Sequence, residues 1–193
     1  MCSSDLWILG EILQNDLGTG LYLAEVLTGK VDIALLPSMF FLASGLTSFA
    51  MGSSWGTLAI VVPIAIPMTL SFSGVTTPVT PDQITILFPV IGSILSGAVL
   101  GDHISPISDT TIMTSTSTGS HHMDHVKTQF FYALPVLISS LFGFLIAGLS
   151  APYGIASSSI SALLASIIIT FILLFSLDKT KTQREKTAQN NEK

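Results

Sequence analysis

The sequence predicts an all-α polytopic membrane protein. Only 10% of the 193 residues are charged, whereas about a quarter is usual in a soluble domain. Asp82 is the single charged residue between Ile33 and Gly101, and residues 128–177 contain none. Because about 20 apolar residues cross the hydrocarbon core, such stretches indicate membrane spans in series. A soluble enzyme, a nucleic-acid-binding protein and a disordered chain are therefore excluded.

The N-terminal part of the chain predicts an interrupted start. Residues 1–6 can be encoded by ATG TGC TCT TCC GAT CT, which looks like the end of a sequencing adapter, so we expect a non-native leader there. Residues 7–31 are expected to contain the end of a truncated helix and then an interfacial helix, with apolar residues at helical spacing around Glu25. Since transporters built from two repeats need more spans, the missing N-terminal half is expected to be a partner of this chain.

A membrane transport domain is expected over residues 33–177, beginning with a hairpin at 34–72. Two short apolar stretches in the hairpin flank a polar tip, Met51–Thr57. This pattern indicates a re-entrant hairpin or an interrupted pair of spans, because irregular backbone at membrane depth needs protein or a water-filled cavity around it. Pro63 and Pro67 predict a bend in the second helix.

Residues 84–120 predict one discontinuous transmembrane helix. An apolar stretch ends at Gly101, and the polar segment Gly101–Thr111 follows it with two aspartates. The segment Ile112–Ser120 is rich in Ser and Thr and is too short and polar to span a membrane alone. We therefore expect an unwound middle between two half-helices.

The C-terminal part predicts a polar loop at 121–127, spans at 130–149 and 159–177, and a basic tail at 178–193. The tail holds five of the seven basic residues, which by the positive-inside tendency places it in the cytoplasm. Counting spans backwards then makes the 121–127 loop cytoplasmic and the turn at 73–83 external.

The candidate cation- and proton-binding site centres on Asp102 and Asp109. A carboxylate at mid-membrane costs roughly 2.5–3.5 kcal/mol on insertion scales, so such residues usually line a pathway or bind a cation. Hydroxyl groups around them are hard oxygen ligands. The alternative is that Ser108 or Asp109 only caps the following half-helix, which accounts for one aspartate and not the pair. The candidate ligands in this segment are Ser105, Ser108, Thr110 and Thr111.

The tip supplies Ser53, Ser54 and Thr57 as a candidate second wall of this site, or as small residues that let helices pack closely. His103 is a candidate proton relay, because histidine changes its charge near neutral pH; a structural hydrogen-bonding role is equally open. The group His121, His122, Asp124 and His125 resembles a metal site but is more simply a solvated loop. We expect no cofactor and no metal beyond a transported small hard cation.

Two motifs resemble the NhaC-type sodium/proton antiporters. They are Gly52-Ser53-Ser54-Trp55-Gly56-Thr57 running into Val62-Pro63-Ile64-Ala65-Ile66-Pro67, and Gly101-Asp102-His103-Ile104-Ser105-Pro106-Ile107-Ser108-Asp109-Thr110-Thr111 with His125-Val126-Lys127-Thr128-Gln129 after it. The similarity covers the C-terminal half of a family member; Ile104 stands where members commonly have Cys. The resemblance implies a bacterial inner-membrane transporter with inverted repeats, whose sites combine a re-entrant tip with an unwound helix. It also implies that some members exchange organic acids such as malate and lactate.

The resulting hypothesis is sodium/proton antiport in which the cation and protons compete for Asp102 and Asp109, since protonation removes the charge that holds the cation. One alternative is an organic-acid exchanger, which is weakened because the single Arg lies in the tail. A remote alternative is an intramembrane aspartyl protease, which needs two aspartates from different helices. The expected partners are membrane lipid, sodium ions, protons and a second copy in a homodimer, without nucleic acid and without enzyme activity.

Overall fold

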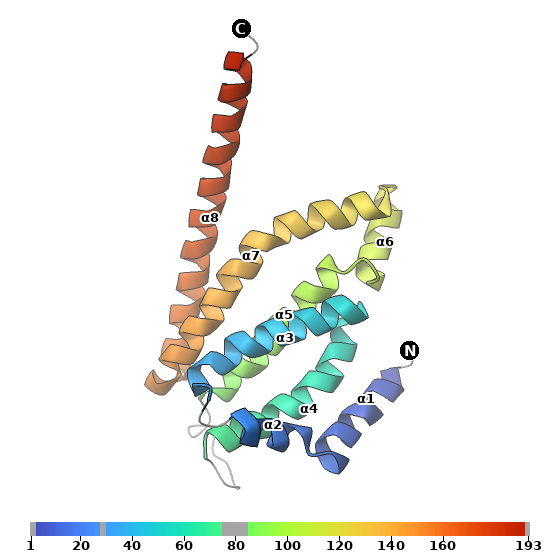
Figure 1. The fold of residues 1–193 in the computed structure, drawn as a ribbon, viewed down its shortest axis with the longest axis vertical. Coiled ribbons are helices and arrows are strands. Elements are labelled where there is room, and N and C mark those ends of the chain that lie inside the picture. The colour runs from blue at the N-terminus through green and yellow to red at the C-terminus, as the bar shows by residue number, and fades with distance from the viewer. Residues whose placement is uncertain (1–2, 28–29, 75–84, 192–193) are drawn as a thin grey trace.

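The computed structural model describes residues 3–27, 30–74 and 85–191, all of whose regular elements are helical (Figure 1). The predicted all-α class is therefore confirmed. Five helical segments in this described part are long and apolar enough to cross a membrane. The elements are α1 (Ser3–Glu11), a π-helical turn η1 (Ile12–Asp16), α2 (Thr19–Leu27), a 3-10 turn η2 (Ile33–Leu35), α3 (Leu36–Met51), α4 (Ser54–Phe72), α5 (Leu87–Ile104), α6 (Asp109–Thr118), α7 (His122–Ser150), a 3-10 turn η4 (Ala151–Tyr153) and α8 (Ile155–Asn191).

The most extensive contact between helices in the described part of the chain lies between α3 and α5. A Cβ atom at Gly101 would overlap the carbonyl oxygen of Gly45, and one at Gly97 would overlap the Ser44 hydroxyl. The Ser48 hydroxyl donates to the carbonyl oxygen of Ala98 across the interface at 2.6 Å. Small residues allow backbones to approach in a membrane, where no hydrophobic effect drives helices together. The α3–α5 contact therefore fixes the helix that carries Asp102.

The hairpin α3–α4 lies against α5, and α1 and α2 lie along α4 (Figure 1). α4 continues as a helix through Pro63 and Pro67. A proline leaves the carbonyl four residues earlier without its helical donor. The carbonyl oxygen of Ala59, four residues before Pro63, lies against Gly10 of α1, where no Cβ could fit. This contact explains how a short N-terminal helix packs against a proline-containing span.

The prediction of a polar loop at 121–127 is wrong, because α7 begins at His122. Asp124 lies in the first turn of α7, where the helix dipole favours a carboxylate. The prediction assumed that a helix ends where its apolar residues end. Polar residues can extend a helix, however, when their side chains lie in water. The same reason explains why α8 runs without a break from the expected span at 159–177 into the tail at 178–193, as far as Asn191.

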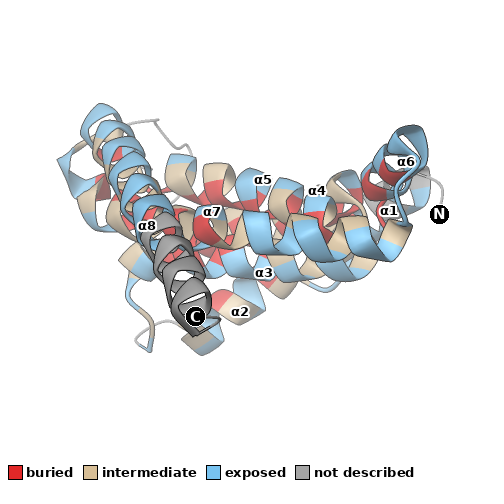
Figure 2. Ribbon diagram, turned by 90° about the horizontal axis from the view of Figure 1, so that it is seen from above, coloured by how far each residue is buried: buried red, intermediate tan, exposed pale blue. Residues whose placement is uncertain are grey.

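The outer helices are the least covered. In Figure 2 the part of α8 that is coloured by burial is mostly exposed or intermediate, and only 6% of its most apolar stretch is buried. Residues 75–84 and 1–2 lie outside the described residues, so most of the turn expected at 73–83 and the start of the expected leader fall there.

Candidate functional site

Two irregular connections meet at one place in the structure. The turn after α3 contains Gly52, whose φ of 66° favours glycine. A Cβ atom there would lie 2.9 Å from the carbonyl carbon of Ile107, which belongs to the break between α5 and α6. The Ser105 hydroxyl in that break donates to the carbonyl oxygen of Phe49 at 2.8 Å. The hairpin tip and the helix break are therefore packed against each other.

Asp102 lies at this junction, half-buried near the end of α5. Its Oδ1 accepts a hydrogen bond of 2.6 Å from Ser108 Oγ. Its Oδ2 accepts from Thr110 Oγ1 at 3.2 Å and, at 3.5 Å, from Ser54 Oγ of the hairpin tip. One carboxylate thus gathers hydroxyl groups from α4, the break and α6.

Ser108 is buried and precedes α6 with extended backbone angles, the geometry of a helix N-cap. Its side chain nevertheless makes no capping hydrogen bond. The hydroxyl is directed to Asp102, and it also lies 2.6 Å from Thr110 Oγ1. The capping interpretation therefore does not account for Ser108.

Asp109 does not join this cluster. It is exposed in the first turn of α6, and its carboxylate makes no hydrogen bond or ion pair within the part of the chain that the structure describes. The break directs the two aspartates to different surroundings. The geometry therefore makes Asp102 the candidate binding carboxylate, whereas Asp109 lies at the exposed edge of the site.

The remaining hydroxyl residues singled out in the sequence have structural contacts. Ser53 caps α4 by accepting from the Gly56 amide at 3.2 Å, and the buried Thr57 hydroxyl donates to the Ser53 carbonyl at 2.9 Å. Thr111 Oγ1 donates to the carbonyl oxygen of His103 at 3.4 Å and so ties α6 to α5. These hydrogen bonds stabilise the elements around the site, and none of them is made to Asp102.

Two histidines flank the break. His103 is exposed, and its Nδ1 donates to the Val99 carbonyl at 2.9 Å. The sequence singled out His122 only as part of a possible metal group or a solvated loop, yet its Nε2 donates to the Pro106 carbonyl at 2.7 Å. Its Nδ1 lies 3.0 Å from Ser115 Oγ. His122 therefore joins the break, α6 and α7, a role that sequence spacing does not reveal.

The histidine group resembles no metal site in the structure. His121 Nδ1 lies 3.8 Å from Asp124 Oδ2, with both side chains largely exposed. Among the residues that the structure describes, no three His, Cys, Asp or Glu side chains gather in a way that could hold a metal ion.

Comparison with known proteins decides the family. The family model described as the Na+/H+ antiporter family matches residues 7–149. The chain belongs to this family. The resemblance seen in the two motifs is thereby confirmed, and the family is one of transporters, not of enzymes.

Curated relatives of this chain differ in what they carry. A protein of unassigned function from Haemophilus influenzae is 32% identical over 90% of this chain and 30% of its own length. The malate-2H(+)/Na(+)-lactate antiporter of Bacillus subtilis is 33% identical over 58% of this chain and 22% of its own length. The arginine/ornithine antiporter ArcD of Halobacterium salinarum is 36% identical over 62% of this chain and 23% of its own length. The chain thus spans less than a third of the length of these relatives, so the expectation that it covers half of a family member is wrong. No solved structure matches it.

Proposed function

We propose that this chain forms part of a sodium/proton antiporter in which Na⁺ and protons compete for Asp102. The observation that carries the proposal is the carboxylate of Asp102 surrounded by the hydroxyls of Ser108, Thr110 and Ser54 at the contact of two irregular connections. Carboxylate and hydroxyl oxygens are hard ligands, which suit a small hard cation.

The hydroxyl groups around Asp102 serve both states of such a site. Each is a donor that can rotate and present a lone pair instead. With the carboxylate free, the hydroxyls of Ser108 and Thr110, at 2.6 and 3.2 Å, donate to Asp102. With Na⁺ bound, the same oxygens turn their lone pairs to the ion. A proton on Asp102 removes the charge that holds the cation, so one site binds either species and their fluxes are coupled.

The finer topology belongs to the same proposal. We place α3 and α4 as a re-entrant hairpin in one repeat of an inverted-repeat fold, because its tip meets a broken helix, as in transporters with discontinuous helices. The basic residues of the tail favour a cytoplasmic C-terminus in a bacterial inner membrane. The remainder of the full-length protein supplies the other repeat.

An organic-acid exchanger on the same scaffold is the second candidate, favoured by the malate-2H(+)/Na(+)-lactate relative. A carboxylate substrate is usually held by arginine, whose fork of donors matches its oxygens. The single Arg of this chain, Arg184, lies in the tail, and the junction at Asp102 offers a negative charge. This part of the protein therefore fits a cation better than an anion.

The test uses the full-length transporter that contains this chain, in everted membrane vesicles. Asp102→Asn keeps the size of the side chain and removes its charge, so sodium-dependent collapse of a proton gradient should fall to background. Asp109→Asn is the matched control from the same segment. Because Asp109 lies outside the hydroxyl cluster, the variant should keep most of the activity with a weaker apparent affinity for sodium.

Full activity in Asp102→Asn would sink the site assignment. Equal loss in both variants would show that the two aspartates act together, contrary to the observed geometry. Sodium flux measured without any organic acid separates the two candidate functions: flux that requires malate or lactate would replace the antiport proposal with the exchanger.

A further inference from the structure

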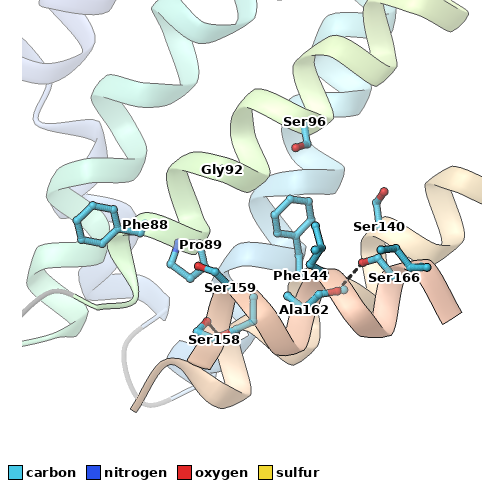
Figure 3. Close-up of a pocket in the computed structure, with 14 residues that line it drawn as sticks. Phe88, Pro89, Gly92, Ser96, Ser140, Phe144, Ser158, Ser159, Ala162 and Ser166 are labelled. Atoms are coloured by element: carbon cyan, nitrogen blue, oxygen red, sulfur yellow. Dashed lines mark hydrogen bonds between the residues drawn. The ribbon is translucent and has the colours of Figure 1, made fainter. Parts of the chain in front are cut away.

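Three cavities that share lining residues follow α5 and α7 toward Asp102, and we call them together the groove. Its first part, about 360 Å³, lies where α7 and α8 meet and includes Ser96 and Ser140 (Figure 3). These two serines also line a second part of about 470 Å³, which reaches His103 and Gln129. The last two residues line a third part of about 210 Å³, where Thr110 is also part of the wall. Thr110 donates to Asp102 at 3.2 Å, so the third cavity lies one side chain away from that carboxylate.

The groove follows one face of each helix. On α5 it is lined at Pro89, Gly92, Ser96 and His103, positions that recur at the three- and four-residue spacing of one helix face. The rise of 1.5 Å per residue makes the distance from Pro89 to His103 about 21 Å, most of the thickness of a hydrocarbon core. The groove is therefore long enough to lead from one side of the membrane to the Asp102 site.

Two serines of the groove, Ser96 and Ser140, differ from neighbouring serines in their hydrogen bonding. Ser93, one turn before Ser96, is fully buried and donates to the Val90 carbonyl at 2.7 Å. Ser139, next to Ser140, is likewise buried and donates to the Val136 carbonyl at 3.0 Å. Within the described residues, the side chains of Ser96 and Ser140 make no hydrogen bond to protein groups.

Polar groups without a protein partner are costly at membrane depth unless water reaches them. The two groove serines lie on facing helices, Ser96 on α5 and Ser140 on α7 (Figure 3). His103 and Gln129 continue the same polar line toward Thr110. Lipid tails could not satisfy these groups, whereas a file of water molecules could.

We propose that this groove is the water-filled pathway by which sodium ions and protons reach Asp102 from the side of the membrane where α7 turns into α8. This inference rests on the proposed antiport at Asp102. In the pathway, Ser96 and Ser140 replace part of the hydration shell of the moving ion, and His103 and Gln129 line the last step before Thr110. The opposite face of α5, packed on α3, takes no part.

The test introduces single cysteines into the full-length transporter that contains this chain, after its native cysteines are replaced by serine. The groove variants are Ser96→Cys and Ser140→Cys. The controls are Leu95→Cys, which is 46% exposed but lines none of the cavities described here, and Ser93→Cys on the packed face. The probe is a cationic, membrane-impermeant methanethiosulfonate, which reacts with thiolate and therefore requires water at the thiol.

Both groove cysteines should be labelled at least about tenfold faster than both controls, because only thiols in water ionise readily. Labelling is followed by the mass increase, and transport is compared in each variant before and after labelling. Labelled groove variants should lose sodium-driven proton flux, whereas Leu95→Cys should keep it.

Labelling of Ser96→Cys and Ser140→Cys at the rate of Leu95→Cys would overturn the water-filled groove. Labelling without loss of flux would overturn its role as the pathway. The outcome at Asp102 is read separately: if Asp102→Asn keeps full flux while labelling of the groove still blocks transport, the pathway stands and the binding site lies elsewhere along it.

Discussion

The two faces of α5 have opposite structures. On the face toward α3, Gly97 and Gly101 approach the neighbouring backbone so closely that no Cβ atom would fit. On the face toward α7, Gly92 has only a Phe144 ring carbon at 3.9 Å from a Cβ position, and Ser96 is exposed in the groove. One helix thus has a tightly packed face and an open face at the same depth.

This difference teaches how a broken helix can be held in place without closing its site. The packed face holds the broken helix in position. Ser48 of α3 donates a hydrogen bond to α5, and Ser105 of the break donates one to α3. The open face is then free to admit water. A transporter needs both properties near its binding carboxylate, because an ion must be held by fixed ligands and must also be able to leave.

The largest expected effect separates two Gly→Ala changes on these faces. Gly101→Ala would place a methyl group against the Gly45 carbonyl and 2.8 Å from the Phe49 amide nitrogen. Backbone atoms cannot move aside easily, so we expect a loss of about 1–3 kcal/mol or more. Gly92→Ala meets only ordinary contact and gains helix propensity, so stability should be unchanged or higher. Thermal unfolding in detergent measures both; equal midpoints would contradict the contrast.

A second comparison tests whether the hydrogen bonds of His122 hold the break between α5 and α6 in place. His122→Ala removes the hydrogen bonds to the Pro106 carbonyl and to Ser115. At about 0.5–1.5 kcal/mol each, their loss should loosen the break and raise the KM for sodium about threefold to tenfold or more. His121→Ala is the control, because the His121 side chain is largely exposed and, within the described residues, makes no hydrogen bond to the break. Proton flux measured at several sodium concentrations gives the KM of each variant. An unchanged KM in both variants would refute the role of His122.

The smallest effect compares two serines on the two faces. Ser48→Ala removes the 2.6 Å bond to the Ala98 carbonyl and should cost about 0.6–1 kcal/mol, as interhelical hydrogen bonds in membranes do. Ser96→Ala loses no protein partner, so its stability should stay within about 0.5 kcal/mol of the parent. Unfolding of the two variants side by side in one detergent gives the difference. A larger loss in Ser96→Ala than in Ser48→Ala would mean that the groove is filled by protein.

The helical class could be predicted from the distribution of charge. Long uncharged stretches cross the membrane, where few structures other than helices satisfy the backbone hydrogen bonds. The polar segment at 101–111 also indicated where a helix would break, and α5 ends at Ile104 while α6 begins at Asp109. The start of α7 at His122 could not be predicted, since nothing in a polar sequence tells whether it forms a loop or a solvated helical turn.

The site was harder to predict than the fold. Sequence spacing treats Asp102 and Asp109 alike, yet the break turns the chain so that one meets the hydroxyl cluster and the other is exposed. Ser54 could be paired with Asp102 only as a hypothesis, because their contact depends on how the hairpin lies against α5. The groove likewise depends on how α7 packs beside α5, and the local sequence pattern does not predict that packing.

The turn at Gly52 has a mechanical consequence. Since its backbone rests directly on Ile107, the hairpin tip cannot tilt toward the break, nor can the break shift toward the tip, unless both travel together. We therefore expect the two connections to behave as a single hinge block during the transport cycle, with the motion taken up by the helices on either side of them.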